Sequence, residues 1–435
     1  MRARVLVVAC LLVTAGCASP LGGTDTPPGY DEDPRGWEGG YWYDDAVDVD
    51  ASDGLDEAEL DAVTVRAMAR IERIRGLEFE EDVPVEVISR EAFRERGGLG
   101  RSYTARDDVV WEAAMIVGED TTAEAAFAEV YGGSVAGYYS GGRIVVVADD
   151  PDAAAVSRAT LVHELVHALQ AQHLRLGGSA SSLDGRRAAT GLVEGDANYV
   201  MDRYEERCGE EWDCIEQAPR VPSSRSYNRG LFLATFAPYS DGPTFVGDLR
   251  ERGGWDAVDD AYDAFPASTE QLIHPERYPD DGPVNVTVPD RSADGWERFG
   301  GTETLGEATL YATFQHNGVI PDAHLTSDDR RYNYSHPITE GWAGDTVVPY
   351  RADGEYGYVF ASEWESRADA REFAAAYRDL LDGRGAERVG DGVYRVPEDD
   401  PFGDAFRVVR EGRTVRVVNA PTVADLSAVH AERAG

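Results

Sequence analysis

Two histidines and a glutamate stand at a spacing that suits metal chemistry in the stretch LVHELVHALQAQH, residues 161–173. His163 and His167 are four positions apart, so a helix places both imidazoles on one face, about 6 Å apart along its axis. Imidazoles are common ligands of zinc, and Glu164 beside them could take a proton from a zinc-bound water. The pattern H-E-x-x-H is therefore typical of a metal-dependent peptidase.

The residues around this motif favour a metal site over a pair of incidental histidines. The chain has only eight histidines, so a chance match to the motif is about a 1% event. The flanking positions are almost all apolar, which predicts a buried helix, and a buried glutamate beside two histidines needs a partner. A metal ion would supply that partner.

The third ligand has two candidates in the sequence. His173 has the spacing of the longer pattern H-E-x-x-H-x-x-G-x-x-H, but Gln170 replaces the glycine at which the chain would leave the helix. If the helix continues, His173 lies about 15 Å along the axis from His163 and packs in the core instead. Glu194 follows His167 by 27 residues, on the next predicted helix, which a short loop allows to fold back antiparallel. We therefore predict Glu194 as the third ligand.

The segments HELVHALQ and LVEGDANY together resemble the gluzincin zinc metallopeptidases, in which a glutamate on the following helix completes the site. The resemblance implies that His163, His167 and Glu194 bind zinc and that Glu164 is the general base. It rests on residues 163–199 of the 435. The wider layout also resembles haloarchaeal surface lipoproteins with a gluzincin-like core, through the segments STEQLIHPERYP, GGW at 253–255, GWAGD at 341–345 and RTVRVVNAPTV.

Further residues are expected to support the metal and the reaction. Some gluzincins carry an aspartate four positions after the ligand glutamate, where it orients a histidine; Asn198 holds that position here, and Asp202 could contribute the missing charge. Peptide hydrolysis also needs a hydrogen-bond donor for the oxyanion. We expect it from His274 or Tyr278, because a His or Tyr of a later segment commonly has this role in gluzincins. The alternative for His274 is a structural turn with Pro275.

The elements that position these residues follow from periodicity and turn signals. Helices are predicted at about 153–176 and 188–206, and a hairpin at 133–150. The hairpin residues Tyr138 and Tyr139 could form the strand beside the cleft, where an extended peptide could pair with the sheet edge.

The rest of the chain gives the fold class. Helices are expected from Leu55 and at 243–251, 254–264 and 304–316, with a short strand at 85–88. From Trp342 the order is strand, strand, helix, three strands and a short helix, which indicates a smaller unit. We predict an α+β fold, with a mainly helical, zincin-like core, a small sheet and a C-terminal α+β unit. The predicted parts are a lipoprotein-type signal peptide at 1–17, an acidic disordered tether at 18–57, a gluzincin-like metallopeptidase domain at 58–340 and the C-terminal unit at 341–435.

The charge of the chain is extreme. It has 81 acidic and 41 basic residues, a formal charge of −40, and every basic residue is arginine. An acidic, lysine-free surface keeps a protein hydrated at molar salt, where the Debye length is only about 3 Å. The composition therefore indicates a halophilic protein. It argues against nucleic acid as a partner, because phosphate binding needs clustered basic residues.

The N-terminus MRARVLVVACLLVTAGCASP has a basic start, a short apolar run and small residues, which predict a secretory signal. The ending T-A-G-C resembles a lipoprotein signal box with Cys17 as the lipidated residue, although Thr14 replaces the usual leucine. The alternative is an ordinary signal with an incidental cysteine. Outside the cell, Cys208 and Cys214 are expected to form a disulfide. Glycosylation acceptor patterns stand at Asn285 and Asn333.

These observations predict a zinc-dependent peptidase at the cell surface, anchored to the membrane by an N-terminal lipid and acting on peptide or protein substrates. Glu164 would be its general base. The alternative is a surface lipoprotein of structural or interaction function that contains zinc but is catalytically silent. A solute-binding lipoprotein is a weaker third alternative, because nothing in the sequence indicates two similar α/β lobes.

Overall fold

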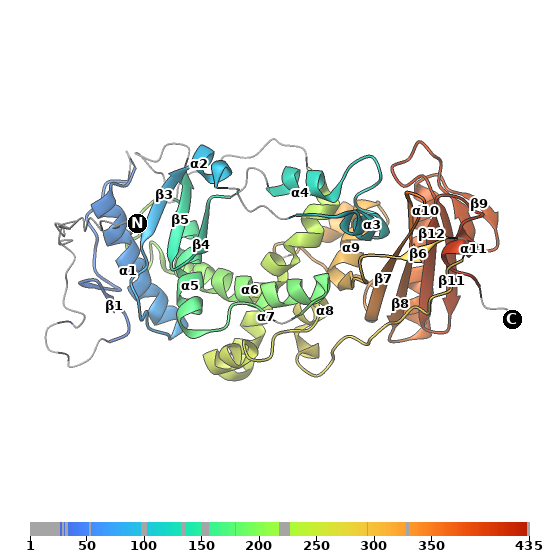
Figure 1. Ribbon diagram of the computed structural model, residues 1–435. Coiled ribbons are helices and arrows are strands. Elements are labelled where there is room, and N and C mark those ends of the chain that lie inside the picture. Colours follow the sequence, from blue (N-terminus) through green and yellow to red (C-terminus); the bar gives the residue numbers. More distant parts are fainter. Residues whose placement is uncertain are drawn as a thin grey trace, which may run out of the picture.

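The fold is α+β, as predicted (Figure 1). A helical middle part lies between a three-stranded sheet at one end and a seven-stranded sheet at the other. The computed structural model describes residues 27, 30, 34–51, 54–96, 102–131, 135–148, 156–178, 180–216, 227–293, 295–327 and 330–432. The predicted signal peptide with Cys17, and the first part of the predicted tether, lie outside these residues.

The N-terminal sheet packs against α5 (Arg158–His173), the site helix, which carries His163 and His167. It has the order β3–β5–β4, with β3 parallel and β4 antiparallel to β5. The predicted hairpin is present, and its turn uses two glycines, Gly141 and Gly142, that both have positive φ. Helix α1 packs against the site helix and begins with a capping box at Asp56. The bounds are α1 Glu57–Arg75, β3 Val85–Ser89, β4 Gly137–Ser140 and β5 Arg143–Ala148.

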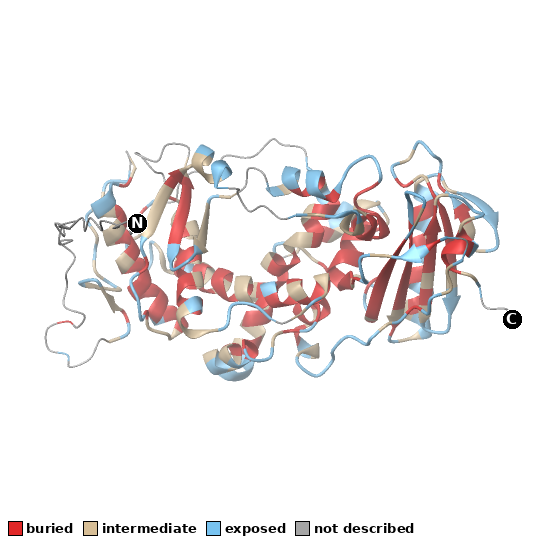
Figure 2. Ribbon diagram, in the orientation of Figure 1, coloured by how far each residue is buried: buried red, intermediate tan, exposed pale blue. Residues whose placement is uncertain are grey.

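Three long helices form the middle of the molecule, and about half of their residues are buried (Figure 2). They are α5 Arg158–His173, α6 Leu183–Arg207 and α7 Arg229–Ala261. The helices α6 and α7 approach closely at Gly195 and Gly242. A Cβ on Gly195 would lie only 2.4 Å from the carbonyl oxygen of Gly242, so a side chain there would clash. Helix α7 includes both helices predicted at 243–251 and 254–264, and its backbone leaves helical geometry between them, at Gly253 and Gly254.

Shorter elements surround these helices. Helix α3 lies beside the large sheet, and α9 packs against α7 (Figure 1). Among the described residues, no helix combines the length and the apolar content that a bilayer crossing needs. The remaining bounds are β1 Trp37–Glu38, β2 Tyr41–Trp42, α2 Arg90–Glu95, α3 Ala105–Ala113, α4 Ala123–Tyr131, α8 Thr269–Ile273, η2 Pro275–Arg277, α9 Gly306–His316 and η3 Asp322–Leu325.

The C-terminal sheet has the order β6–β7–β8–β12–β11–β10–β9. Its alternating side chains build two cores: α10 covers one face and α11 the other. Four strands follow α10 instead of the three predicted, because β9 and β10 pair as a separate short hairpin. The edge strand β6 comes from before residue 341. The bounds are β6 Glu297–Arg298, β7 Trp342–Ala352, β8 Glu355–Trp364, α10 Arg367–Gly383, β9 Glu387–Gly390, β10 Val393–Arg395, β11 Ala405–Glu411, β12 Thr414–Ala420 and α11 Leu426–Val429.

Candidate metal centre

Helices α5 and α6 bring together the three residues that the sequence analysis assigned as ligands. The Nε2 atoms of His163 and His167 lie 3.1 Å apart. Glu194 Oε2 lies 3.1 Å from His163 Nε2 and 3.5 Å from His167 Nε2. Two imidazole nitrogens and a carboxylate oxygen therefore converge on one point, as a three-ligand zinc site requires.

The electrostatics of this cluster reflect its burial. Burial alone would lower the pKa of His167, but the contact with Glu194 outweighs it and raises that pKa to about 9. Burial would raise the pKa of Glu194, and the two histidines instead hold it well below its usual range. Glu194 Oε2 is nevertheless buried without a hydrogen bond of normal geometry. An orphaned carboxylate oxygen facing two ring nitrogens is the arrangement that a metal ion would satisfy.

A buried network orients His167 from behind. Its Nδ1 atom lies 2.8 Å from Gln170 Oε1, which can only accept, so Nδ1 carries a proton and Nε2 is the nitrogen that faces the other two ligands. The Gln170 amide nitrogen donates to Val193 O and to Asp196 Oδ2. Arg75 Nε in turn lies 3.0 Å and 3.1 Å from the two oxygens of Asp196.

Asn198 does not contact either imidazole, contrary to the expectation for that position. Its Nδ2 donates to the backbone carbonyl of Glu194 at 2.7 Å, and its Oδ1 accepts from Arg331 at 3.4 Å. Burial raises the pKa of Asp202 and the nearby Arg331 opposes that rise, and no histidine is among the groups that act on it. Gln170 orients the imidazole instead. It lies three positions after His167 on α5, so the two side chains share one face of the helix.

Glu164 lies between the ligands and the small sheet. It is buried, and its carboxylate accepts a hydrogen bond from the backbone N–H of Tyr139 on β4. Burial is the main cause that raises its pKa. Since β4 is the edge strand of its sheet, the sheet edge runs beside the prospective base.

His173 lies away from the ligands, as the sequence analysis expected of a helix that continues through Gln170. Helix α5 ends at His173 itself. Its Nε2 contacts the carbonyl oxygen of Glu78, and its Nδ1 lies 3.7 Å from Glu80.

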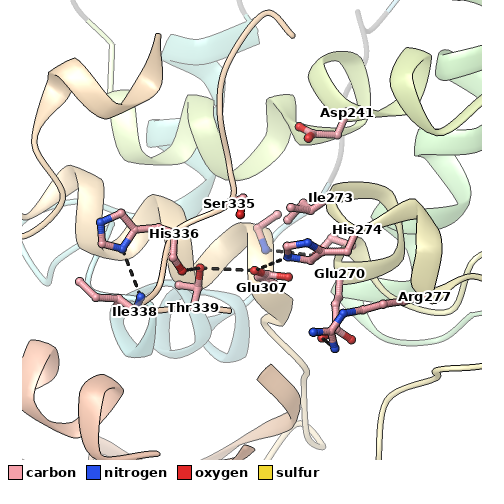
Figure 3. Close-up of polar contacts among 12 residues, drawn as sticks. Asp241, Glu270, Ile273, His274, Arg277, Glu307, Ser335, His336, Ile338 and Thr339 are labelled. Carbon is pink, nitrogen blue, oxygen red and sulfur yellow. Dashed lines mark hydrogen bonds and ion pairs between the residues drawn. The ribbon is translucent and has the colours of Figure 1, made fainter. Parts of the chain in front are cut away.

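Neither His274 nor Tyr278 is brought to the three ligands by any contact among the described residues. His274 Nε2 lies 3.2 Å from Glu307 Oε1, and Thr339 also donates to that carboxylate (Figure 3). Tyr278 donates its hydroxyl to Ala264 O at 2.7 Å. These contacts are those of a structural turn, the alternative considered for His274, followed by the short helix η2.

Tyr239 is a residue that the sequence analysis missed. It is a partly buried residue of α7, and its hydroxyl is within hydrogen-bonding range of the Glu194 carboxylate. Burial, and then the charge of Glu194, raise its pKa well above the usual value, so it keeps its proton. No spacing from the H-E-x-x-H motif identifies Tyr239. It reaches the site only because α7 packs closely on α6.

The other predicted sites are remote from this centre. Cys208 and Cys214 form a disulfide at the end of α6. Asn285 is exposed, whereas Asn333 is half-buried and its side chain bonds the backbone N–H of Ser335 and contacts His324. Glycosylation of either residue stays a prediction.

Comparison with known proteins gives one family match. Residues 297–430 match the model of a domain of unknown function, DUF8575. This region contains the seven-stranded sheet and lies wholly after the three candidate ligands. No curated protein and no solved structure matches the chain.

Proposed function

We propose that this protein is a zinc-dependent peptidase of gluzincin type. The observation that carries the proposal is the convergence of His163, His167 and Glu194, with Glu164 adjacent. A set of two imidazoles and one carboxylate is that of a catalytic zinc site, which leaves a further position for water or substrate. When bound, zinc would polarise the scissile carbonyl and make a water molecule more acidic.

The residues of the chain have separable roles in this proposal. Glu164 accepts the proton of the attacking water, and its hydrogen bond from Tyr139 N–H holds the carboxylate in place. Tyr239 keeps its proton and donates a hydrogen bond to the oxygen that becomes negative, the role first expected of His274 or Tyr278. An extended peptide could pair with the outer edge of β4, which has no partner strand among the described residues, and this would align the scissile bond with Glu164.

The N-terminal sequence supports a place outside the cell for this activity. The signal-like start and the T-A-G-C pattern at Cys17 favour a lipid-anchored surface protein, and the disulfide between Cys208 and Cys214 suits an oxidising compartment. The substrate would then be an extracellular peptide or protein.

The test combines metal analysis with peptide cleavage on the full chain in molar salt. Wild type should carry one zinc and cleave members of a peptide library. Glu164→Gln should keep the zinc and lose cleavage, whereas Glu194→Ala should lose both. Glu206→Ala, an exposed position on the same helix as Glu194, serves as the matched control and should change neither.

Two results would count against the proposal in different ways. Wild type that binds no zinc at stoichiometric supply would exclude the metal site itself. Wild type that binds zinc yet cleaves no peptide would favour the catalytically silent surface protein.

A further inference from the structure

A second group of carboxylates lies far from the zinc candidate, where the helical part meets the C-terminal sheet. Glu112 belongs to the last turn of α3, Glu119 to the loop that follows, and Asp404 stands directly before β11. One oxygen from each of the three lies within 4.8 Å of the others. The group thus joins two parts of the chain that are far apart in sequence.

Two of these carboxylates are deeply buried. Glu112 is 7% exposed and Asp404 5% exposed, while Glu119 is exposed and opens the group to solvent. The side-chain carboxylate of Glu112 makes no hydrogen bond or ion pair with any described residue. Asp404 accepts one hydrogen bond, from Asn419 Nδ2 at 2.8 Å. Asn419 is itself fully buried, and its Oδ1 has no partner among the described residues.

Among the described residues, no basic side chain forms an ion pair with these carboxylates. The charged groups that act on Glu112 and Asp404 are further carboxylates, namely Glu119, Asp108 and Glu355. Burial, and then this repulsion, raises the pKa of Glu112 well above its usual value, and burial raises the pKa of Asp404 to about 7. A buried charge without a partner is strongly unfavourable, because it has lost its hydration and gained nothing in exchange. The chain has 41 arginines, yet none is paired with this group among the described residues. A bound cation could therefore supply the positive charge that the group lacks.

We propose that Glu112, Glu119 and Asp404 bind a calcium ion. All the donors are carboxylate oxygens, which suit a hard cation and not zinc. Calcium accepts a variable set of oxygen ligands, so water entering past the exposed Glu119 can complete its shell. The ion also lies at the C-terminal end of α3, where the helix dipole favours positive charge.

The ion ties the helical part to the C-terminal sheet. The loop after α3 already contacts the segment before β11, through a hydrogen bond from Glu119 N to Pro401 O at 2.8 Å. Calcium held by Glu112 and Asp404 adds a second link at the same junction. This site is separate from the proposed peptidase site, because among the described residues the two groups share no ligand and no side-chain contact.

The test is calcium binding by the chelator-treated full chain in molar sodium chloride. Thermal unfolding and titration calorimetry should show one calcium per chain, a rise in Tm of several degrees, and a Kd on the order of 10⁻⁴–10⁻³ M, as in extracellular calcium modules. Glu112→Gln should abolish the response to calcium. The matched control is Glu372→Gln, an exposed acid of α10 outside the group, which should keep it.

The cation-free state gives a second, opposite readout. Glu112→Gln should raise Tm above that of chelated wild type, because it removes repulsion between buried carboxylates. If wild type shows no heat and no change in Tm at about 10 mM calcium, a shared proton balances the group and the proposal is overturned. If the variant does not fold, terbium luminescence on wild type decides the question. Tyr358 is buried beside Glu112 and should sensitise bound terbium, with calcium as competitor, and absence of that signal overturns the site.

Discussion

The two candidate metal sites differ in how the protein balances their charge. At His163, His167 and Glu194 the carboxylate faces two groups that can be cationic, and a polar network lies behind them. At Glu112, Glu119 and Asp404 the charged neighbours among the described residues are all acids. The first site is therefore organised by the chain before any ion binds, whereas the second depends on an ion to become favourable. Removing a charged side chain should therefore destabilise the protein at the first site and stabilise the cation-free protein at the second.

The largest effect should come from Arg75, whose charge anchors the network behind the first site. Arg75 is 1% exposed and pairs with Asp196, which is fully buried. Arg75→Ala leaves Asp196 as an uncompensated buried charge, so the free energy of unfolding should fall by about 3–5 kcal/mol. Denaturant unfolding measures it. Arg73→Ala, an exposed position in the same helix, should cost no more than about 1 kcal/mol.

This result would separate the two sites sharply, since Glu112→Gln is expected to stabilise the cation-free protein. A loss below about 1 kcal/mol for Arg75→Ala would mean that the network does not balance the first site. The claim that the chain itself balances the charge of the first site, but not that of the second, would then be wrong.

The next effect concerns the chemistry of the first site, where the Tyr239 hydroxyl interacts with the Glu194 carboxylate. Tyr239→Phe removes that hydroxyl but leaves the three ligands intact. We expect kcat for peptide cleavage to fall by about 10²–10³-fold with zinc content unchanged. Tyr227→Phe, an exposed tyrosine close before α7, is the control. An equal fall in both variants, or loss of zinc in Tyr239→Phe, would assign Tyr239 a structural role.

The sequence predicted the parts of the first site that depend on local spacing. The four-residue separation of His163 and His167, and the apolar stripe around them, follow from helix periodicity. Glu194 could be chosen because its helix follows directly along the chain. Tyr239 could not, since its position depends on how closely α7 approaches α6 at Gly195 and Gly242.

The second site was missed for a related reason. Glu112 and Asp404 belong to different parts of the fold, and each is one of 81 acidic residues, so neither stands out in sequence. Only the docking of α3 on the C-terminal sheet brings them together. Likewise, the fourth strand after α10 escaped prediction because β9 is exposed and lacks an apolar alternation.

A smaller effect is expected where the buried network contacts His167, at Gln170. Gln170→Ala leaves Nδ1 of His167 without its acceptor, so zinc affinity should fall by about 10–100-fold. Competition with a chromogenic chelator measures it. The matched control is Gln172→Ala, on the same helix, whose side chain instead bonds the backbone of Glu80 and Glu81. Equal affinities in the two variants would show that the network supports folding but not the metal.

The smallest effect is expected at Asn198, where sequence reasoning placed the orienting residue. Its side chain holds the carbonyl of Glu194, a bond that α6 can replace with its own helical hydrogen bonds. Asn198→Ala should therefore change zinc affinity by no more than about twofold, far less than a partner of a metal-bound histidine. If Asn198→Ala instead matches Gln170→Ala, then a movement on metal binding brings the amide to an imidazole. The first site would then be organised by its ion, and it would resemble the second more than its hydrogen bonds indicate.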